Sequence, residues 1–138
     1  MSLLNVFDIA GSAMSAQTIR MNVTASNMAN VDSVSSSTGK TYRARHPVFE
    51  TVYSDTMGDK SISNGVRVAG IIESQKELRK EYMPQHPAAD DDGYVYFPNV
   101  NPIEEMTNMI SASRTYQNNV EIINASKQML MRTLSIGQ

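Results

Sequence analysis

Residues suited to one helix face recur at steps of three and four positions at both ends of the chain. In the N-terminal segment this repeat runs through Leu3, Val6, Phe7, Ala10, Ala13, Met14, Met21 and Met28. In the last third it runs through Met106, Ile110, Ser113, Tyr116, Val120, Ile123, Lys127, Leu130 and Leu134. Since three- and four-residue steps follow one face of an α-helix, the sequence predicts a long helix at each terminus.

The boundaries of the two helices are marked by capping and turn residues. Asn101 suits the cap of the second helix, Pro102 its first position and Gly137 its end. The first helix ends before the Ser-rich loop 33–39. We expect the two helices to meet along a seam formed by Phe7, Met14, Met21, Ile110, Val120, Ile123, Leu130 and Leu134.

The residue pattern in the middle of the chain predicts short strands. Val48–Tyr53 is rich in β-branched and aromatic residues, Gly65–Ile72 alternates, and Tyr94–Phe97 follows an acidic turn. Residues 73–81 fit either a strand extension or an exposed helical turn. The prolines of 84–102 predict an extended connector.

The expected fold is therefore mainly α with a small β-rich middle. Residues 1–32 form an N-terminal assembly helix, 33–100 the β-rich middle segment and extended connector, and 101–138 a C-terminal assembly helix. The two terminal helices pair as a coiled-coil-like hairpin, with short strands and the extended connector between them. A middle of this size buries a marginal core, so the helices need neighbours as well as each other.

The terminal helices carry few charges, and this makes assembly their expected role. Between residues 2 and 31 the only charged side chains are Asp8 and Arg20. A helix that faces water normally carries interspersed Lys and Glu. Helices without them can be covered on several sides without the cost of desolvating ions. The net charge of −2 gives no electrostatic reason to expect a nucleic-acid or anionic-membrane partner.

Composition excludes several further classes. The chain has no cysteine, so disulfides, thiolate catalysis and Cys-based zinc sites are ruled out. No run of about 18 apolar residues is present, so we expect no membrane span. The N-terminus lacks the basic flank and apolar core of a cleavable signal peptide, so any export must use another route.

The candidate chemical groups do not converge on a reaction. His46 and His86 have no ligands at metal-binding spacing, and a structural or solvent-exposed role is expected for both. Asp90-Asp91-Asp92-Gly93 lacks the spaced ligands of a calcium loop and is predicted to be a solvated turn. Lys40, Arg43 and Arg45 around Tyr42 fit a solvated strand face. We therefore expect no catalytic, metal or cofactor site.

Asn27-Met28-Ala29-Asn30, at the end of the first helix, resembles the Asn-x-Ala-Asn signature of bacterial flagellar rod, hook and hook-associated axial proteins. Within this group the chain is similar to the proximal members of the flagellar basal-body rod protein family. The residues that carry the resemblance are Asn27, Ala29, Asn30, Gly93, Tyr94, Pro98, Asn99, Asn101, Pro102, Glu105, Met106, Tyr116 and Asn119. The chain departs from the family where a Ser-rich insert delays Gly39 and Tyr42.

The resemblance implies a structural subunit of the proximal rod, the periplasm-spanning drive shaft that transmits motor torque to hook and filament. It implies export through the flagellar type III apparatus without a cleaved signal. The implied partners are copies of the chain, other rod proteins, the rod–MS-ring adaptor, the MS ring and export gate, and the distal rod. We also expect the Asn27–Asn30 turn and Asn99–Asn101 to position the helices against adjacent subunits, with buried amides satisfied across interfaces.

Two alternatives stand beside this interpretation. One is a structural subunit with terminal coiled coils from another secretion or tail-like assembly, which shares the assembly physics but not the Asn27–Asn30 and Pro98–Pro102 signatures. The other is a small enzyme or ligand-binding domain built on the middle segment. Such a domain requires a convergent set of polar residues, which the sequence does not show.

Overall fold

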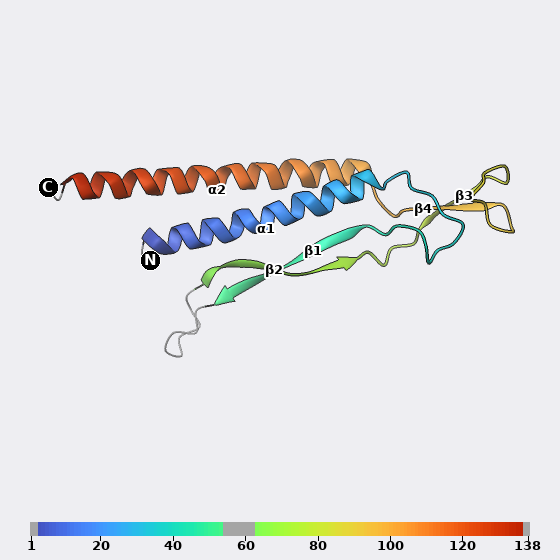
Figure 1. Cartoon of the computed structure of the whole chain (residues 1–138), viewed down its shortest axis with the longest axis horizontal. Helices are drawn as coiled ribbons and strands as arrows, with labels where there is room; N and C mark the ends of the chain where they lie inside the picture. The colour runs from blue at the N-terminus through green and yellow to red at the C-terminus, as the bar shows by residue number, and fades with distance from the viewer. Residues whose placement is uncertain (1–2, 54–62, 137–138) are drawn as a thin grey trace.

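The computed structural model describes residues 3–53 and 63–136, and in it two long antiparallel helices lie side by side (Figure 1). Helix α1 spans Leu3–Ala29 and helix α2 spans Pro102–Ile136. Four strands lie between them in the chain: β1 (Arg45–Tyr53), β2 (Ser63–Glu73), β3 (Arg79–Tyr82) and β4 (Tyr94–Phe97). The predicted fold, mainly α with a small middle of short strands, is confirmed.

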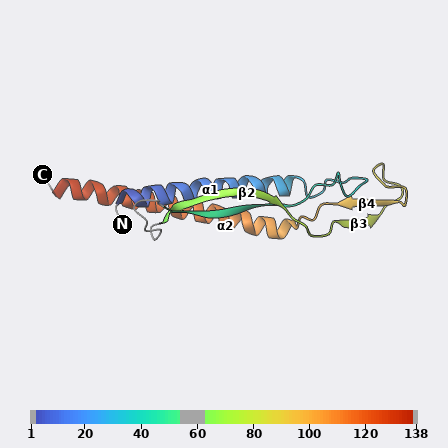
Figure 2. The same ribbon diagram turned by 90° about the horizontal axis from the view of Figure 1, so that it is seen from below.

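The strands form two separate antiparallel hairpins. The β1–β2 hairpin runs along α1 and contacts it through both strands (Figures 1 and 2). The β3–β4 hairpin lies beyond the end of the helix pair, past the C-terminus of α1. The three predicted strands are present. Of the region left open by the sequence, 79–82 forms β3.

The start of α2 agrees with its predicted cap. Asn101 Oδ1 accepts hydrogen bonds from the backbone N–H groups of Ile103 (3.0 Å) and Glu104 (3.5 Å). Pro102 is the first helical residue. These two bonds satisfy donors that have no partner inside the helix. The predicted closing residue, Gly137, lies outside the described residues.

The buried positions of the two helices are mostly small. They include Ala10, Ala16 and Thr24 on α1, and Ala112 and Ser126 on α2. Small side chains let two backbones approach closely, so the helices pack without large interdigitating groups. Large apolar residues are therefore left for other surfaces.

This packing corrects part of the predicted seam. In the single chain Ile110, Val120 and Leu134 are 53%, 36% and 70% exposed. The buried positions of α2 are instead Glu105, Ala112 and Ser126, each one residue before a member of the predicted repeat, so the helix is turned by about 100° there. Other predicted members are half-buried: Phe7, Met14, Met21, Ile123 and Leu130. The small residues take the seam because they allow the closest approach.

A close approach of backbone to helix fixes the β1–β2 hairpin on α1. Ser12 Oγ accepts a hydrogen bond from the Val66 N–H (3.1 Å) and donates one to the Ile9 carbonyl (2.8 Å). Gly65 lies against this hydroxyl. Its backbone φ is +133°, a value that residues with a side chain rarely adopt. A Cβ at this position would overlap Ser12 Oγ.

Gly65→Ala is therefore expected to destabilise the fold by about 1–3 kcal/mol, through backbone strain and displacement of Ser12. The matched control is Gly70→Ala in the same strand, where an added Cβ meets nothing within 4 Å. Urea unfolding followed by circular dichroism measures both. Equal free energies of unfolding for the two variants would contradict the close approach at Gly65.

Candidate functional site

The side chain of Asn27 is fully buried at the end of α1 and makes four hydrogen bonds. Its Oδ1 accepts from the Tyr42 hydroxyl (2.8 Å) and the Arg45 N–H (2.9 Å). Its Nδ2 donates to the Arg45 carbonyl (2.8 Å) and to Glu105 Oε2 (3.1 Å). One amide thus joins α1, the start of β1 and the first turns of α2. Both lone pairs of Oδ1 and both N–H groups of Nδ2 are therefore used by partners in the same chain.

Asn99 has a similar bonding role in the connector between β4 and α2. Its Oδ1 accepts from the Ala44 N–H (2.8 Å), and its Nδ2 donates to the carbonyls of Lys76 (2.8 Å) and Ser74 (3.4 Å). The Ser74 N–H also bonds the Ala44 carbonyl (2.7 Å). Asn99 therefore fixes this connector to the segments before β1 and after β2. We call Asn27, Asn99 and their partners the asparagine junction.

The junction corrects the expectation that the amide of Asn27 is satisfied across an interface, because its four partners lie in the same chain. Glu105 is only 3% exposed and lies in the first turn of α2. The positive end of the helix dipole favours a carboxylate there, and Asn27 donates to it. The role of the motif in meeting adjacent subunits stays a prediction.

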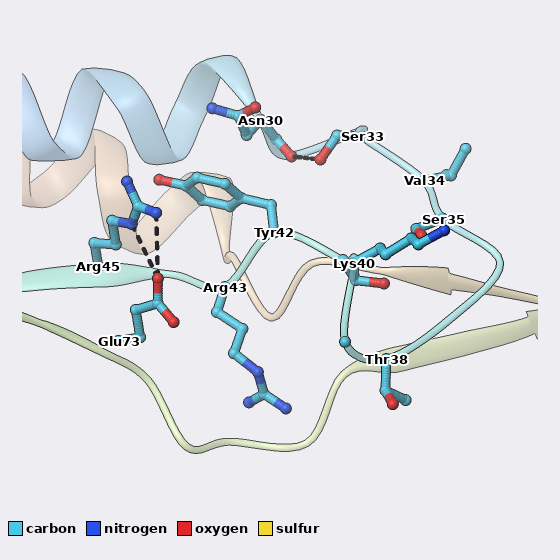
Figure 3. A pocket seen from close by; sticks show the side chains of 12 residues that line it. Asn30, Ser33, Val34, Ser35, Thr38, Lys40, Tyr42, Arg43, Arg45 and Glu73 are labelled. Atoms are coloured by element: carbon cyan, nitrogen blue, oxygen red, sulfur yellow. Dashed lines mark hydrogen bonds and ion pairs between the residues drawn. The ribbon is translucent and has the colours of Figure 1, made fainter.

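An open hollow of about 660 Å³ lies beside the junction, lined by polar residues of the loop after α1 and by the start of β1 (Figure 3). The basic residues at this hollow do not converge. Arg45 pairs with Glu73 (3.2 Å) and lies 5.4 Å from the centre of the Tyr42 ring. Arg43 donates to the backbone carbonyls of Ser74 (3.1 Å) and Lys76 (3.3 Å). Both arginines thus stabilise the fold by binding groups at or just after the end of β2.

The acidic turn before β4 is an internally bonded loop. Asp90 Oδ1 accepts from the N–H groups of Asp92 (3.1 Å) and Tyr94 (2.8 Å), and Oδ2 accepts from the Tyr96 hydroxyl (3.3 Å). Burial raises the pKa of Tyr96 and the Asp90 carboxylate raises it further, so the phenol stays protonated and donates. Gly93, with φ of +82°, lets the chain turn into β4.

Neither histidine belongs to a reactive group. His86 Nδ1 accepts the Ala88 N–H (3.1 Å), and His46 borders a small hollow with Arg20 and Phe49. Across residues 3–53 and 63–136 no three His, Asp or Glu side chains are grouped so that they could hold a metal ion. Within the same ranges no helix is long and apolar enough to span a bilayer.

The remaining motif residues divide between the junction, the caps and the surface. Tyr94 packs edge-on against Tyr82, with ring centres 5.3 Å apart, and Pro98 is buried. Asn30 Nδ2 donates to the Ser26 carbonyl (2.7 Å), and Asn119 Nδ2 to the Thr115 carbonyl (2.8 Å). Tyr116 is half-buried, whereas the exposed members are Ala29, Asn101, Pro102 and Met106.

Tyr42, Arg45 and Ser12 are structural contacts that the sequence did not indicate. The hydroxyl of Tyr42 and the backbone of Arg45 complete the Asn27 site, but they lie 15 and 18 residues from Asn27 in the chain. The one sequence signal was the position of Tyr42 and Arg45 just after the loop that follows the Asn27 motif.

Exposed apolar side chains recur along α2. We define the α2 stripe as the residues Ile103, Met106, Ile110 and Val120, all exposed. Two further large apolar residues, Met131 and Leu134, are exposed closer to the C-terminus of α2. A surface of this kind is typical of a protein–protein contact. Arg114 and Glu121 are exposed on the same side of α2.

Asn27→Ala is expected to lower the free energy of unfolding by about 3 kcal/mol or more, because it strips hydrogen bonds from several buried groups, Glu105 among them. Asn30→Ala is the control, since the side chain of Asn30 makes one local hydrogen bond. Loss of that bond should lower the free energy of unfolding by less than about 1 kcal/mol. Chemical denaturation measures both. A smaller effect at Asn27 than at Asn30 would overturn the role of the junction.

Asn27→Asp preserves shape but places a carboxylate oxygen where Nδ2 now lies 3.1 Å from Glu105. Two carboxylates in contact repel, so one of the pair holds its proton to a higher pH than it does in the unfolded chain. The stabilising contribution of that proton is present at low pH and lost as the pH rises. The variant should therefore be more destabilised, relative to the unsubstituted chain, at pH 8 than at pH 5. A pH-independent difference would contradict this.

Comparison with known proteins places this geometry in a family. Residues 7–35 match the family described as flagella basal body rod protein, and residues 91–136 match the family described as flagellar basal body rod FlgEFG protein C-terminal. The two matches contain Asn27 and Asn99, the two amides of the junction.

Curated relatives align along the whole chain. The chain is 49% identical to the flagellar basal-body rod protein FlgC of Salmonella typhimurium and 51% identical to that of Yersinia enterocolitica, each over 138 residues. It is 45% identical to FlgC of Buchnera aphidicola subsp. Acyrthosiphon pisum over 140 aligned positions. Each alignment covers 100% of both chains. The resemblance read from the motifs is confirmed, and the chain belongs to the FlgC family of flagellar basal-body rod proteins, which are structural subunits and not enzymes.

Proposed function

We propose that this chain is a subunit of the proximal part of the flagellar rod, where it assembles with copies of itself and with other rod proteins. The family supports a structural rod subunit in the basal body. The observation that carries the proposal is the exposed α2 stripe on a chain whose polar motif residues are used for internal bonding. Such a chain is built to be covered by neighbours.

The geometry suggests how the subunit is organised in a tube wall. The paired α1 and α2 form a stiff unit, because the asparagine junction ties both helices to the strands at one end. The sparsely charged helix surfaces pack inward against neighbouring helices, and the hairpins lie outside them. Torque then passes through many side-chain contacts between subunits, and no single residue carries it.

The finer parts of the proposal concern neighbours and route. The proximal position implies contact with the rod–MS-ring adaptor and the MS ring or export gate on one side, and with the distal rod on the other. We propose that the chain crosses to the periplasm unfolded, through the flagellar type III apparatus and without a cleaved signal. A core of small side chains supports this route, because it buries little apolar surface and the folded chain is therefore easily unfolded.

The alternative is a subunit of another secretion or tail-like assembly. A deletion strain separates the two. Under the rod proposal the strain lacks complete basal bodies and does not swim, and the gene supplied in trans restores both. Normal motility with intact basal bodies in the deletion strain would exclude the rod role.

Ile110→Asp is expected to abolish motility of the complemented strain while leaving the isolated chain folded. Ile110 is half exposed in the single chain, so its replacement changes the free energy of unfolding by less than about 1 kcal/mol. In the rod it would bury a charge at a cost of several kcal/mol in every subunit. The readouts are swimming, basal-body yield and protein level.

Ser111→Asp is the matched control, since it adds the same charge at the next position, about 100° around the helix and off the α2 stripe. It should swim nearly normally. If Ile110→Asp builds rods as well as Ser111→Asp does, the α2 stripe is not an assembly surface.

A further inference from the structure

The β1–β2 hairpin exposes apolar side chains on both of its faces. Ile71 and Ile72 are 50% and 57% exposed, although they are neighbours in β2. Successive residues of a strand point to opposite faces of the sheet, so one of the two lies on the face away from α1. Val48 on β1 is also exposed. A two-stranded sheet with apolar groups on both faces is only half covered by α1.

The α2 stripe lies on the opposite flank of the molecule. Arg20 Nη2 donates to Asn108 Oδ1 (2.9 Å), and Asn108 borders a hollow with His46 and Phe49, so the Asn108 side of α2 faces β1. Met106 and Ile110 are each two residues from Asn108, which turns them about 160° from it around the helix. They therefore point away from the hairpin. Figure 1 shows α2 and the β1–β2 hairpin at the two edges of the molecule, with α1 between them.

We propose that the β1–β2 hairpin of one copy packs against the α2 stripe of a second copy placed side by side with it. This rests on the proposed rod function and names the partner of its exposed surface. Two different surfaces on opposite flanks meet in this contact, so each copy leaves one of each free. A contact of this kind does not close into a dimer but continues into a ring or helical tube.

The two surfaces agree in length. β1 has nine residues, about 30 Å of strand, and Ile103 to Val120 covers about 25 Å of helix. Both run along the long axis of the molecule (Figures 1 and 2). The four residues of the α2 stripe are uncharged, whereas Arg114, four residues after Ile110, and Glu121, next to Val120, are exposed on the same side of the helix. The charges of the hairpin are paired in Arg45–Glu73 (3.2 Å) and Arg67–Glu50 (3.0 Å).

The size of the contact predicts where it forms. A strip about 25 Å long and about 10 Å wide, the width of one helix, covers on the order of 250 Å² per subunit. A stable pair of proteins usually buries about 800 Å² on each partner. The contact is too small to hold two chains together in dilute solution, and it becomes stable where neighbours in the rod add their own contacts.

Disulfide trapping tests the contact, because the natural chain has no cysteine. The double variant Ile71→Cys/Ile110→Cys is expressed in the deletion strain, basal bodies are isolated, and mild oxidant is added. A bond forms only where the two Cα atoms come within about 7 Å. We expect a ladder of dimers and higher oligomers on non-reducing gels from basal bodies, and monomer alone from the dilute purified chain.

Matched variants decide the result. Each single cysteine variant should give no dimer, because the contact joins different surfaces; dimers from a single variant would overturn the proposal. Ile71→Cys/Ser111→Cys moves one cysteine off the α2 stripe and should give little ladder. An equal ladder from that control would also overturn it. If the Ile71/Ile110 pair does not incorporate, Ile72→Cys/Met106→Cys is used in its place.

The experiment separates this inference from the function on which it rests. Motility and basal-body incorporation of the reduced variants report the rod function, whereas the ladder reports the neighbour. Rods that form and swim with neither cysteine pair giving a ladder would refute the side-by-side contact and leave the rod function intact. Failure of the unsubstituted chain to restore motility would refute the rod function itself.

Discussion

The amide of Asn27 is the interaction on which the arrangement of the whole chain depends. Two long helices can slide and rotate against each other when small residues line their seam, because alanine and serine offer few interlocking shapes. The four bonds of Asn27 remove this freedom, since they fix the end of α1 to the backbone of Arg45 and to Glu105 in the first turns of α2. Asn99 then fixes the connector that leads into α2. A buried polar group that is fully bonded specifies one geometry, because each alternative leaves donors or acceptors without partners.

Small and large apolar residues have different tasks in this chain. Ala10, Ala16 and Ala112 are buried in the single subunit, whereas Met106, Ile110 and Leu134 are at least half exposed. Burying a large aliphatic side chain contributes about 1.5–3 kcal/mol, so much of the apolar stabilisation available to the helices is not realised in one chain. In the rod that we propose, it is realised between chains. This division keeps the free subunit marginally stable and makes the assembled state the one in which the helices are fully packed.

Local signals in the sequence were sufficient for the elements but not for their rotation. The cap at Asn101, the first position at Pro102 and three of the four strands are encoded by neighbouring residues, and the structure agrees with each. The predicted repeat of α2 runs one residue after the buried positions Glu105, Ala112 and Ser126, because periodicity weighs apolar size and the helix pair selects small residues such as Ala112. The partners of Asn27 come from residues 15 to 78 positions away, so no local pattern could name them. The motif marked Asn27 and Asn99 as special without saying which bonds they make.

The same constraint explains why the four residues of the α2 stripe are uncharged, although the helix carries exposed charges elsewhere. A subunit that spends time free in solution gains from Lys and Glu on its outer face, but every such charge must lose its water when a neighbour covers it. Ser, Thr, Asn and Gln beside the α2 stripe hold water weakly enough to be covered and still limit aggregation of the free chain. A side-by-side contact of modest area then gives little affinity for a single pair. It gains strength only where several neighbours bind one subunit at once, so a lone pair of chains stays apart while a growing rod captures the next subunit.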